Sequence, residues 1–266
     1  MVPYVGTMIE RTPSLARGDL SLRAEIARRI ELAREPLNEP PCGPSGALLM
    51  AELSYLAEPV LRRVRRESLF IEPAAHPRKI MLLPGFGAHP LRMRYFARQL
   101  EKAGHKAKRW GMGFNSGATP DLLDRIESRL LQLHERYDGE PIVLVGWSLG
   151  GVFAREVAKR HPDKVAKVIT MGSPFSGNPR ANNGWRVYQA VAGHRVDEPP
   201  VEVTTNEKPP VETIAMWSPL DGVVHPRSAC GKPGERDRAI AIRCRHMGFV
   251  YAKDAIETVL SELDRA

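Results

Sequence analysis

The spacing of hydrophobic positions changes near residue 75, and this change divides the chain into two parts. In the first part, apolar residues recur every three or four positions in two stretches, which predicts two amphipathic helices. Proline-rich sequence separates the stretches, and Pro59 is expected to kink the second helix. The first stripe comprises Leu22, Ile26, Ile30, Ala33 and Leu37, and the second comprises Leu49, Leu53, Leu56, Val60 and Val64. We therefore expect residues 1–75 to form a helical appendage.

From residue 76 onward, short apolar runs alternate with amphipathic stretches. This alternation predicts an α/β domain over 76–266 with a mostly parallel central sheet flanked by helices. The stretch 172–210 is rich in Gly, Pro and Asn and is expected to form a short cap insertion. Strands are expected at 79–83, 105–110, 141–147, 167–170, 211–217 and 239–244. Helices are expected around 88–103, 119–136, 149–161, 185–191 and 248–263.

The apolar run at 142–145 ends abruptly at the pentapeptide GWSLG, whose central residue is Ser148. A buried strand followed at once by a helix places this serine on a strand-to-helix turn. Gly146 and Gly150 fall where a sharp turn has no room for side chains, and such a turn exposes the serine hydroxyl. The alternative is a glycine-rich turn with a serine that only caps the helix. The flanking pattern favours a nucleophile.

A serine hydroxyl needs a base and a third group that orients the base. When a serine nucleophile lies on such a strand-to-helix turn, the acid and then the histidine are expected after it in the chain. Asp221 lies in a loop just after a predicted strand, and His246 lies between the last strand and the last helix. Three other histidines are less well placed than His246 because of their positions in the chain. They are His89, His161 and His225.

Acyl transfer also requires hydrogen-bond donors for the negative charge that develops on the carbonyl oxygen. One expected donor is the N–H of Leu149, directly after the serine. The second is the N–H of Phe86, in the loop LLPGFGAHP after the first strand. This loop serves equally well as a plain strand-to-helix turn.

With these residues in view, the region from about 78 to 266 resembles the α/β-hydrolase superfamily, and in particular its near-minimal bacterial lipases and esterases. The segments that carry the resemblance are LLPGFGAHP, RWGMGFNSG, VGWSLGGVFA, ITMGSPFSG, PLDGVVHP and RHMGF. The resemblance implies that Ser148 is the nucleophile, Asp221 the acid and His246 the base. It also implies oxyanion donors at Phe86 and Leu149. Pro84 departs from the histidine that many lipases carry there, and residues 1–75 match no pattern of the family.

The composition limits the partners, cofactors and cell compartment that we expect. The chain of 266 residues carries a net charge of +8, with the excess outside residues 1–75, and its basic residues are scattered, so we expect no nucleic-acid partner. Neither a secretory leader nor an apolar stretch long enough to span a bilayer is apparent, which predicts a cytoplasmic protein. The three cysteines form no zinc-like pattern, and no metal or cofactor is expected. A disulfide between Cys230 and Cys244 is left open.

The expected reaction is hydrolysis of a small or lipid-like carboxylic ester in an open, apolar cleft. The aromatic residues expected to line this cleft are Phe86, Phe114, Phe175 and Trp185. Two alternatives stay open: an acyltransferase that uses the same triad, and a binding module without catalysis. Residues 47–66 combine an apolar stripe with a basic cluster, which is compatible either with peripheral membrane contact or with docking on the parent domain.

Overall fold

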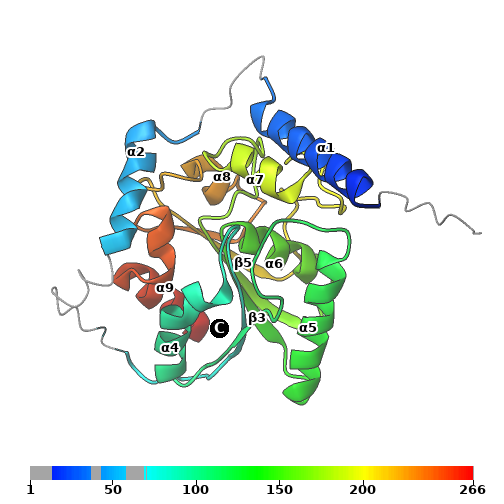
Figure 1. Ribbon diagram of the computed structural model, residues 1–266. Coiled ribbons are helices and arrows are strands. Elements are labelled where there is room, and N and C mark those ends of the chain that lie inside the picture. The colour runs from blue at the N-terminus through cyan, green and yellow to red at the C-terminus, as the bar shows by residue number, and fades with distance from the viewer. Residues whose placement is uncertain (1–13, 37–42, 58–68, 70, 266) are drawn as a thin grey trace, which may run out of the picture.

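A six-stranded parallel sheet forms the centre of the computed structural model, which describes residues 14–36, 43–57, 69 and 71–265 (Figure 1). Its spatial order is β2-β1-β3-β4-β5-β6, so the strand that precedes Ser148 lies inside the sheet. The strands are β1 (Lys79–Leu83), β2 (Lys106–Arg109), β3 (Ile142–Trp147), β4 (Val165–Met171), β5 (Glu212–Trp217) and β6 (Arg238–Ala241). The predicted strands and their parallel arrangement are thus confirmed. All six residues of β3 are buried, as its uninterrupted apolar run predicted.

Helices cover both faces of the sheet, and each face has its own apolar core. On one face, α4 (Arg94–Lys102) and α9 (Lys253–Asp264) contribute Phe96 and Ile256 to the core. On the other face lie α5 (Leu122–Arg136) and α6 (Leu149–Arg160). Figure 1 shows these two pairs on opposite sides of the sheet. The buried strand β3, which lies between these two helical layers, therefore ends at Ser148, where α6 begins.

Several element boundaries differ from the prediction. The helix expected over 88–103 begins as the 3-10 helix η2 (Pro90–Met93), and the last predicted helix is preceded by η3 (His246–Val250). A short helix that the sequence pattern did not predict, α8 (Pro226–Cys230), follows the acid loop. Helices η2 and α8 each begin with a proline that follows a capping histidine, a local signal that hydrophobic periodicity does not detect.

The first part of the chain forms α1 (Ser14–Arg34), α2 (Gly46–Ala51) and η1 (Glu52–Ala57). The later half of the second apolar stripe, with Pro59, lies outside the described residues. Helix α1 packs along α7 (Trp185–Ala192), which belongs to the 172–210 stretch (Figure 1). Leu22, Ile26 and Ile30 stay exposed, and the contact includes Arg29, which donates to carbonyls of α7.

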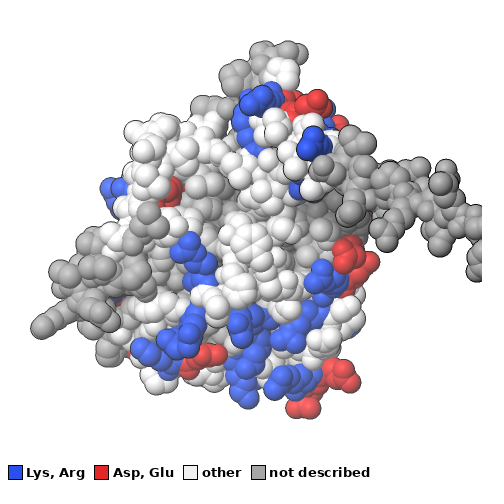
Figure 2. Space-filling view, in the orientation of Figure 1, with Lys and Arg blue, Asp and Glu red and all other residues white. Residues whose placement is uncertain are grey.

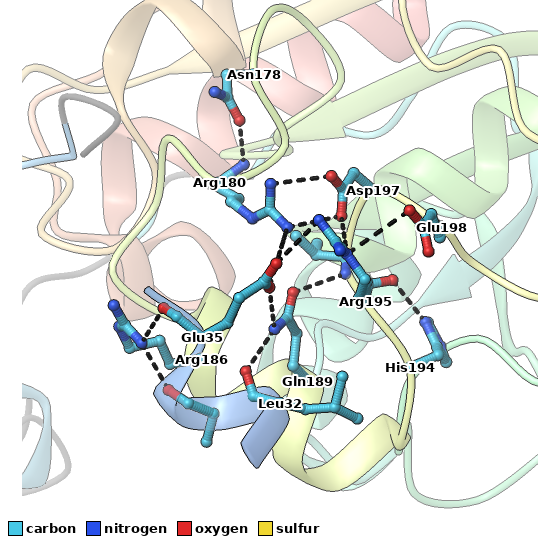
Figure 3. A network of polar contacts seen from close by, with 12 residues as sticks. Leu32, Glu35, Asn178, Arg180, Arg186, Gln189, His194, Arg195, Asp197 and Glu198 are labelled. Carbon is cyan, nitrogen blue, oxygen red and sulfur yellow. Dashed lines mark hydrogen bonds and ion pairs between the residues drawn. The ribbon is translucent and has the colours of Figure 1, made fainter. Parts of the chain in front are cut away.

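Polar contacts fasten the end of α1 to the 172–210 stretch (Figure 3). The Glu35 carboxylate lies 3.1 Å from Arg180 and 2.9 Å from Arg195, and Asp197 lies 2.9 Å from Arg180. Gln189 of α7 donates to the carbonyl of Leu32 at 2.7 Å. Because these groups are partly buried and share partners, they form a network, which fixes geometry better than isolated surface pairs do.

Charged side chains are unevenly spread over the face in Figure 2. Lysines and arginines gather over the region of α4 and α5 with acidic side chains among them, and the surface toward α2 and α7 is largely uncharged. No helix in the described part of the chain is long and apolar enough to cross a bilayer. Cys230 and Cys244 are both free thiols, so the disulfide left open by the sequence does not form in this structure.

Candidate active site

Ser148 lies on a strained turn between β3 and α6, with φ of 53° and ψ of −126°. A non-glycine residue rarely adopts this conformation, which costs about 1–3 kcal/mol and persists only where the surrounding structure enforces it. The two flanking glycines explain how it is enforced. A Cβ on Gly146 would lie 2.4 Å from the backbone of Gly151, and one on Gly150 would lie 2.3 Å from the carbonyl oxygen of Leu83. The sharp strand-to-helix turn that the sequence pattern predicted at Ser148 is therefore present.

His246 and Asp221 are joined by a hydrogen bond of 2.8 Å between Nδ1 and Oδ2. Both side chains are buried, and they come from the two loops that follow β6 and β5. The other carboxylate oxygen of Asp221 accepts hydrogen bonds from the N–H groups of Val223 and Val224, each 2.8 Å long. Asp221 is thus held from both sides. It fixes the imidazole with Nδ1 as the donor and leaves Nε2 free to act as a base.

The electrostatic surroundings favour a protonated imidazole. Burial by itself opposes the charged form, but the Asp221 carboxylate, through its charge and its hydrogen bond, and the nearby Glu52 carboxylate outweigh this effect. Together they raise the pKa of His246 above its ordinary value. A base of raised pKa holds a proton more firmly once it has taken one from a nucleophile.

Ser148 and His246 line the same cavity, which has a volume of about 300 Å³. Most of its other lining residues are apolar and come from the loop after β1, from the start of α6 and from the 172–210 stretch. Those from 172–210 are Pro174, Pro179, Asn182, Gly184, Trp185, Tyr188, Val196, Pro199, Val201, Val203 and Thr205. An apolar cavity with a few convergent polar groups is the usual form of a small-molecule site.

Phe86 and Leu149 also line this cavity, beside Ser148. The loop that carries Phe86 is anchored by Asn115, which donates to the carbonyl of Pro84 at 2.8 Å and accepts from Gly87 N–H at 2.8 Å. Among the described residues, no backbone hydrogen bond occupies the N–H of Phe86 or of Leu149. Two unused donors next to the serine can bind an oxygen that carries negative charge.

Two of the aromatic residues expected to line the cleft are placed elsewhere, and we correct that prediction. Phe114 is 55% exposed and is not part of the cavity wall, because its turn projects into solvent. Phe175 is fully buried and is not part of the cavity wall, and the guanidinium of Arg155 lies 4.1 Å from its ring centre. Phe86 and Trp185 do line the cavity.

Tyr188 is a lining residue that sequence reasoning missed. Its ring meets Phe86 edge-on at 5.1 Å, and its hydroxyl accepts a hydrogen bond from Ala118 N–H at 3.2 Å. Burial raises its pKa to about 12, so the hydroxyl stays protonated at neutral pH. The amphipathic pattern of 185–191 predicts a helix but does not reveal which of its faces meets the serine.

The three competing histidines occupy structural positions outside the cavity wall. His89 caps η2 by accepting from Leu91 N–H, and His225 caps α8 by accepting from Arg227 N–H. His161, at the end of α6, lies 3.2 Å from the Glu127 carboxylate. Within the described residues, no group of three or more potential metal ligands comes together.

Comparison with known proteins agrees with this architecture. A family model described as the alpha/beta hydrolase fold matches residues 80–191. The pimeloyl-[acyl-carrier protein] methyl ester esterase of Chromobacterium violaceum is 31% identical over 115 residues, which are 40% of this chain and 41% of that protein. The biotin biosynthesis bifunctional protein of Teredinibacter turnerae is 30% identical over 122 residues, 44% of this chain and 20% of that protein. The chain thus spans less than half the length of these curated relatives.

Solved structures match a larger share of the chain. A bromoperoxidase from Bacillus anthracis superposes with a TM-score of 0.53 at 16% identity, covering 72% of this chain and 94% of that one. A monoacylglycerol lipase from Paleococcus ferrophilus gives 0.51 at 16% identity, covering 73% and 96%. At such low identity these likenesses concern the fold alone.

Proposed function

We propose that this chain is a serine hydrolase of the α/β-hydrolase superfamily that cleaves carboxylic esters through an acyl-enzyme on Ser148. The main support for the proposal is that the strained Ser148 and the His246 of the Asp221–His246 pair line the same apolar cavity. Two relatives are named as esterases, which supports the more general conclusion that this chain is a hydrolase. The nucleophile, the substrate class and the course of the reaction are our inference.

In the first step, Nε2 of His246 takes the proton of the Ser148 hydroxyl while the oxygen attacks the ester carbonyl. Asp221 keeps Nδ1 protonated and stabilises the imidazolium that forms. The N–H groups of Phe86 and Leu149 bind the tetrahedral oxygen. Removal of one such donor from the oxyanion hole of a serine protease costs about 3 kcal/mol. His246 then protonates the leaving alcohol, and the acyl group stays on Ser148.

In the second step, His246 removes a proton from water as the water oxygen attacks the acyl carbonyl. The bond from the acyl group to Ser148 then breaks, His246 returns the proton to the Ser148 oxygen, and the acid is released. An alcohol or amine in place of water would make the same site an acyltransferase. Product analysis with added acceptor alcohol separates the two reactions, because a transferase forms the new ester at the expense of the free acid.

The substrate class follows from the cavity wall. Valines, prolines and aromatic rings surround the serine, and Arg92 is the cationic side chain among the lining residues. This lining suits esters with an apolar acyl group better than sugars or nucleotides. Two of the relatives are named as methyl ester esterases, which is compatible with a small leaving alcohol.

A fluorophosphonate probe together with p-nitrophenyl butyrate tests the proposed function. We expect the wild-type chain to be labelled and to hydrolyse the ester, and both properties to disappear in Ser148→Ala. Ser128→Ala is the matched control, because Ser128 is exposed on α5 and its hydroxyl bonds only to the helix backbone at Asp124. A wild-type chain that is neither labelled nor active would favour a binding module without catalysis.

We also propose that residues 47–66 contact membrane surfaces peripherally. Leu49, Met50 and Leu53 remain exposed in the described part of this segment, and the sequence beyond it is basic. Sedimentation with anionic phospholipid vesicles provides the test. We expect the wild type to sediment with the vesicles and the Met50→Ser, Leu53→Ser double variant to sediment less. Equal sedimentation of the two proteins would contradict the proposed membrane contact.

A further inference from the structure

Glu52, at the start of η1, reaches the two loops that hold Asp221 and His246. Its Oε1 accepts hydrogen bonds from Gly222 N–H at 2.9 Å and from His246 N–H at 2.8 Å, and its Oε2 accepts from Met247 N–H at 3.1 Å. One carboxylate therefore bonds the residue after the acid, the histidine itself and the residue after the histidine. These partners are 170 to 195 positions away in the sequence.

The carboxylate is buried, with only 6% of the residue exposed. Burying a charged group is costly unless hydrogen bonds replace its lost hydration, and three N–H donors provide that replacement here. Glu52 is also the one charged residue in the mostly apolar stretch LLMAELSYL, whose neighbouring apolar residues Met50 and Leu53 are exposed. In this segment the carboxylate faces the protein and apolar side chains face solvent, the reverse of what docking through the apolar stripe would require.

The backbone around Glu52 is fitted closely to the acid loop. A Cβ on Gly222 would lie 2.3 Å from the carbonyl oxygen of Leu48, so α2 approaches this loop as nearly as a glycine allows. Asn183 donates to the carbonyls of both Pro44 and Gly222, at 3.1 and 2.8 Å. The approach of residues 43–57 to the acid loop is therefore fixed on two sides, independently of the carboxylate.

From this geometry we propose that Glu52 is a positioning residue, which holds the acid loop and the histidine loop in register so that His246 meets both Asp221 and Ser148. The inference rests on the proposed esterase function for its kinetic consequence. It assigns residues 43–57 a part in the active site, although this segment lies outside the 80–191 region that the family model matches.

The carboxylate also acts on the imidazole through its charge. The groups facing His246 are the carboxylates of Asp221 and Glu52 and the neutral rings of Trp147 and Phe249. Arg92 lines the same cavity. Of the two carboxylates, Asp221 contributes more to the raised pKa of His246, and Glu52 adds to it in the same direction.

Glu52→Gln is the informative variant, because the side chain keeps its shape and the oxygen that bonds Gly222 and His246. The new amide NH₂ faces Met247 N–H, so one hydrogen bond and the negative charge are lost. We expect kcat/KM for p-nitrophenyl butyrate to fall about tenfold, mainly in kcat, since small misplacements of catalytic groups cost up to about 10²-fold. Loss of the charge should also move the acidic limb of the pH profile to lower pH.

A direct titration keeps this test independent of the enzymatic proposal. NMR of chain labelled with ¹⁵N-histidine follows the protonation of His246, assigned by comparison with His246→Asn. We expect the midpoint of His246 to be lower in Glu52→Gln than in the wild type, whether or not the chain hydrolyses esters. A wild type without esterase activity would refute the proposed function while the titration still decides the role of Glu52.

Glu25→Gln is the matched control. Glu25 also accepts three hydrogen bonds, from Arg28 and Arg29, but on the exposed surface of α1. It should leave the rate, the pH profile and the titration of His246 unchanged. An unshifted His246 midpoint in Glu52→Gln overturns the proposal whatever happens to the rate, because a residue needed only for stability would not set the pKa of the base.

Discussion

Nδ1 of His246 lies 2.8 Å from Oδ2 of Asp221, while the other oxygen of that carboxylate accepts two backbone N–H groups. The pair therefore has one available orientation, with the free imidazole nitrogen directed away from the acid. Because the carboxylate raises the pKa of His246, the same contact that orients the base also sets the pH at which it becomes available.

The pH dependence of hydrolysis should report this contact. His246 must be neutral to accept the serine proton, so kcat/KM should rise as pH increases through its pKa, with a midpoint above the ordinary histidine value of about 6.5. Asp221→Asn should lower kcat by about 10⁴-fold and move that midpoint to lower pH. Asp121→Asn, at an exposed carboxylate beside α5, is the control. A profile whose acidic limb is identical in wild type and Asp221→Asn would contradict the assignment.

Gly150 should be irreplaceable for stability as well as for activity. A Cβ at this position would lie 2.3 Å from the carbonyl oxygen of Leu83, a backbone atom that cannot move without disturbing β1. Gly150→Ala should reduce the free energy of unfolding by at least about 3 kcal/mol. Gly46→Ala, where a Cβ would meet nothing within 4 Å, should change it little. Denaturant titration of both variants measures the difference, and equal midpoints would count against this packing.

The wall formed by residues 196–205 should limit the length of the acyl chain. Val203 lines the cavity, so Val203→Trp should reduce kcat/KM for p-nitrophenyl decanoate more than for the acetate, by about tenfold or more in the ratio. Val187→Trp is the control, because Val187 is exposed on α7 outside the cavity wall. Parallel losses for both esters in Val203→Trp would place the acyl chain elsewhere.

The cysteines should behave as free thiols of unequal reactivity. Burial, reinforced by the carboxylates of Asp221 and Glu52, raises the pKa of Cys244, whereas Cys230 is partly exposed. In the native protein at pH 8, iodoacetamide should therefore modify Cys230 faster than Cys244. Denatured, unreduced protein should titrate as three thiols, the number in the sequence. A count of one would instead indicate that a disulfide joins Cys230 to Cys244.

Local sequence patterns were sufficient to predict the central strand, the turn at Ser148 and the two loops beside it. A strand buried on both faces must be apolar throughout, and a turn with no room for side chains must use glycine, so the stretch from 142 to 151 predicted both β3 and the strained Ser148. The loops with Asp221 and His246 could be chosen for a similar reason, because successive parallel strands end at the same edge of a sheet.

The sequence by itself thus determined the sheet, the turn at Ser148 and the two loops beside it, since each depends on neighbours within a few residues. Only the tertiary structure decided which side chains meet across long separations. It placed Phe114 in solvent, Phe175 in the buried interior and Tyr188 in the cavity wall, and it brought Glu52 to His246 across 194 positions. Periodicity shows that a segment has two faces, but the packing of distant segments decides what each face meets.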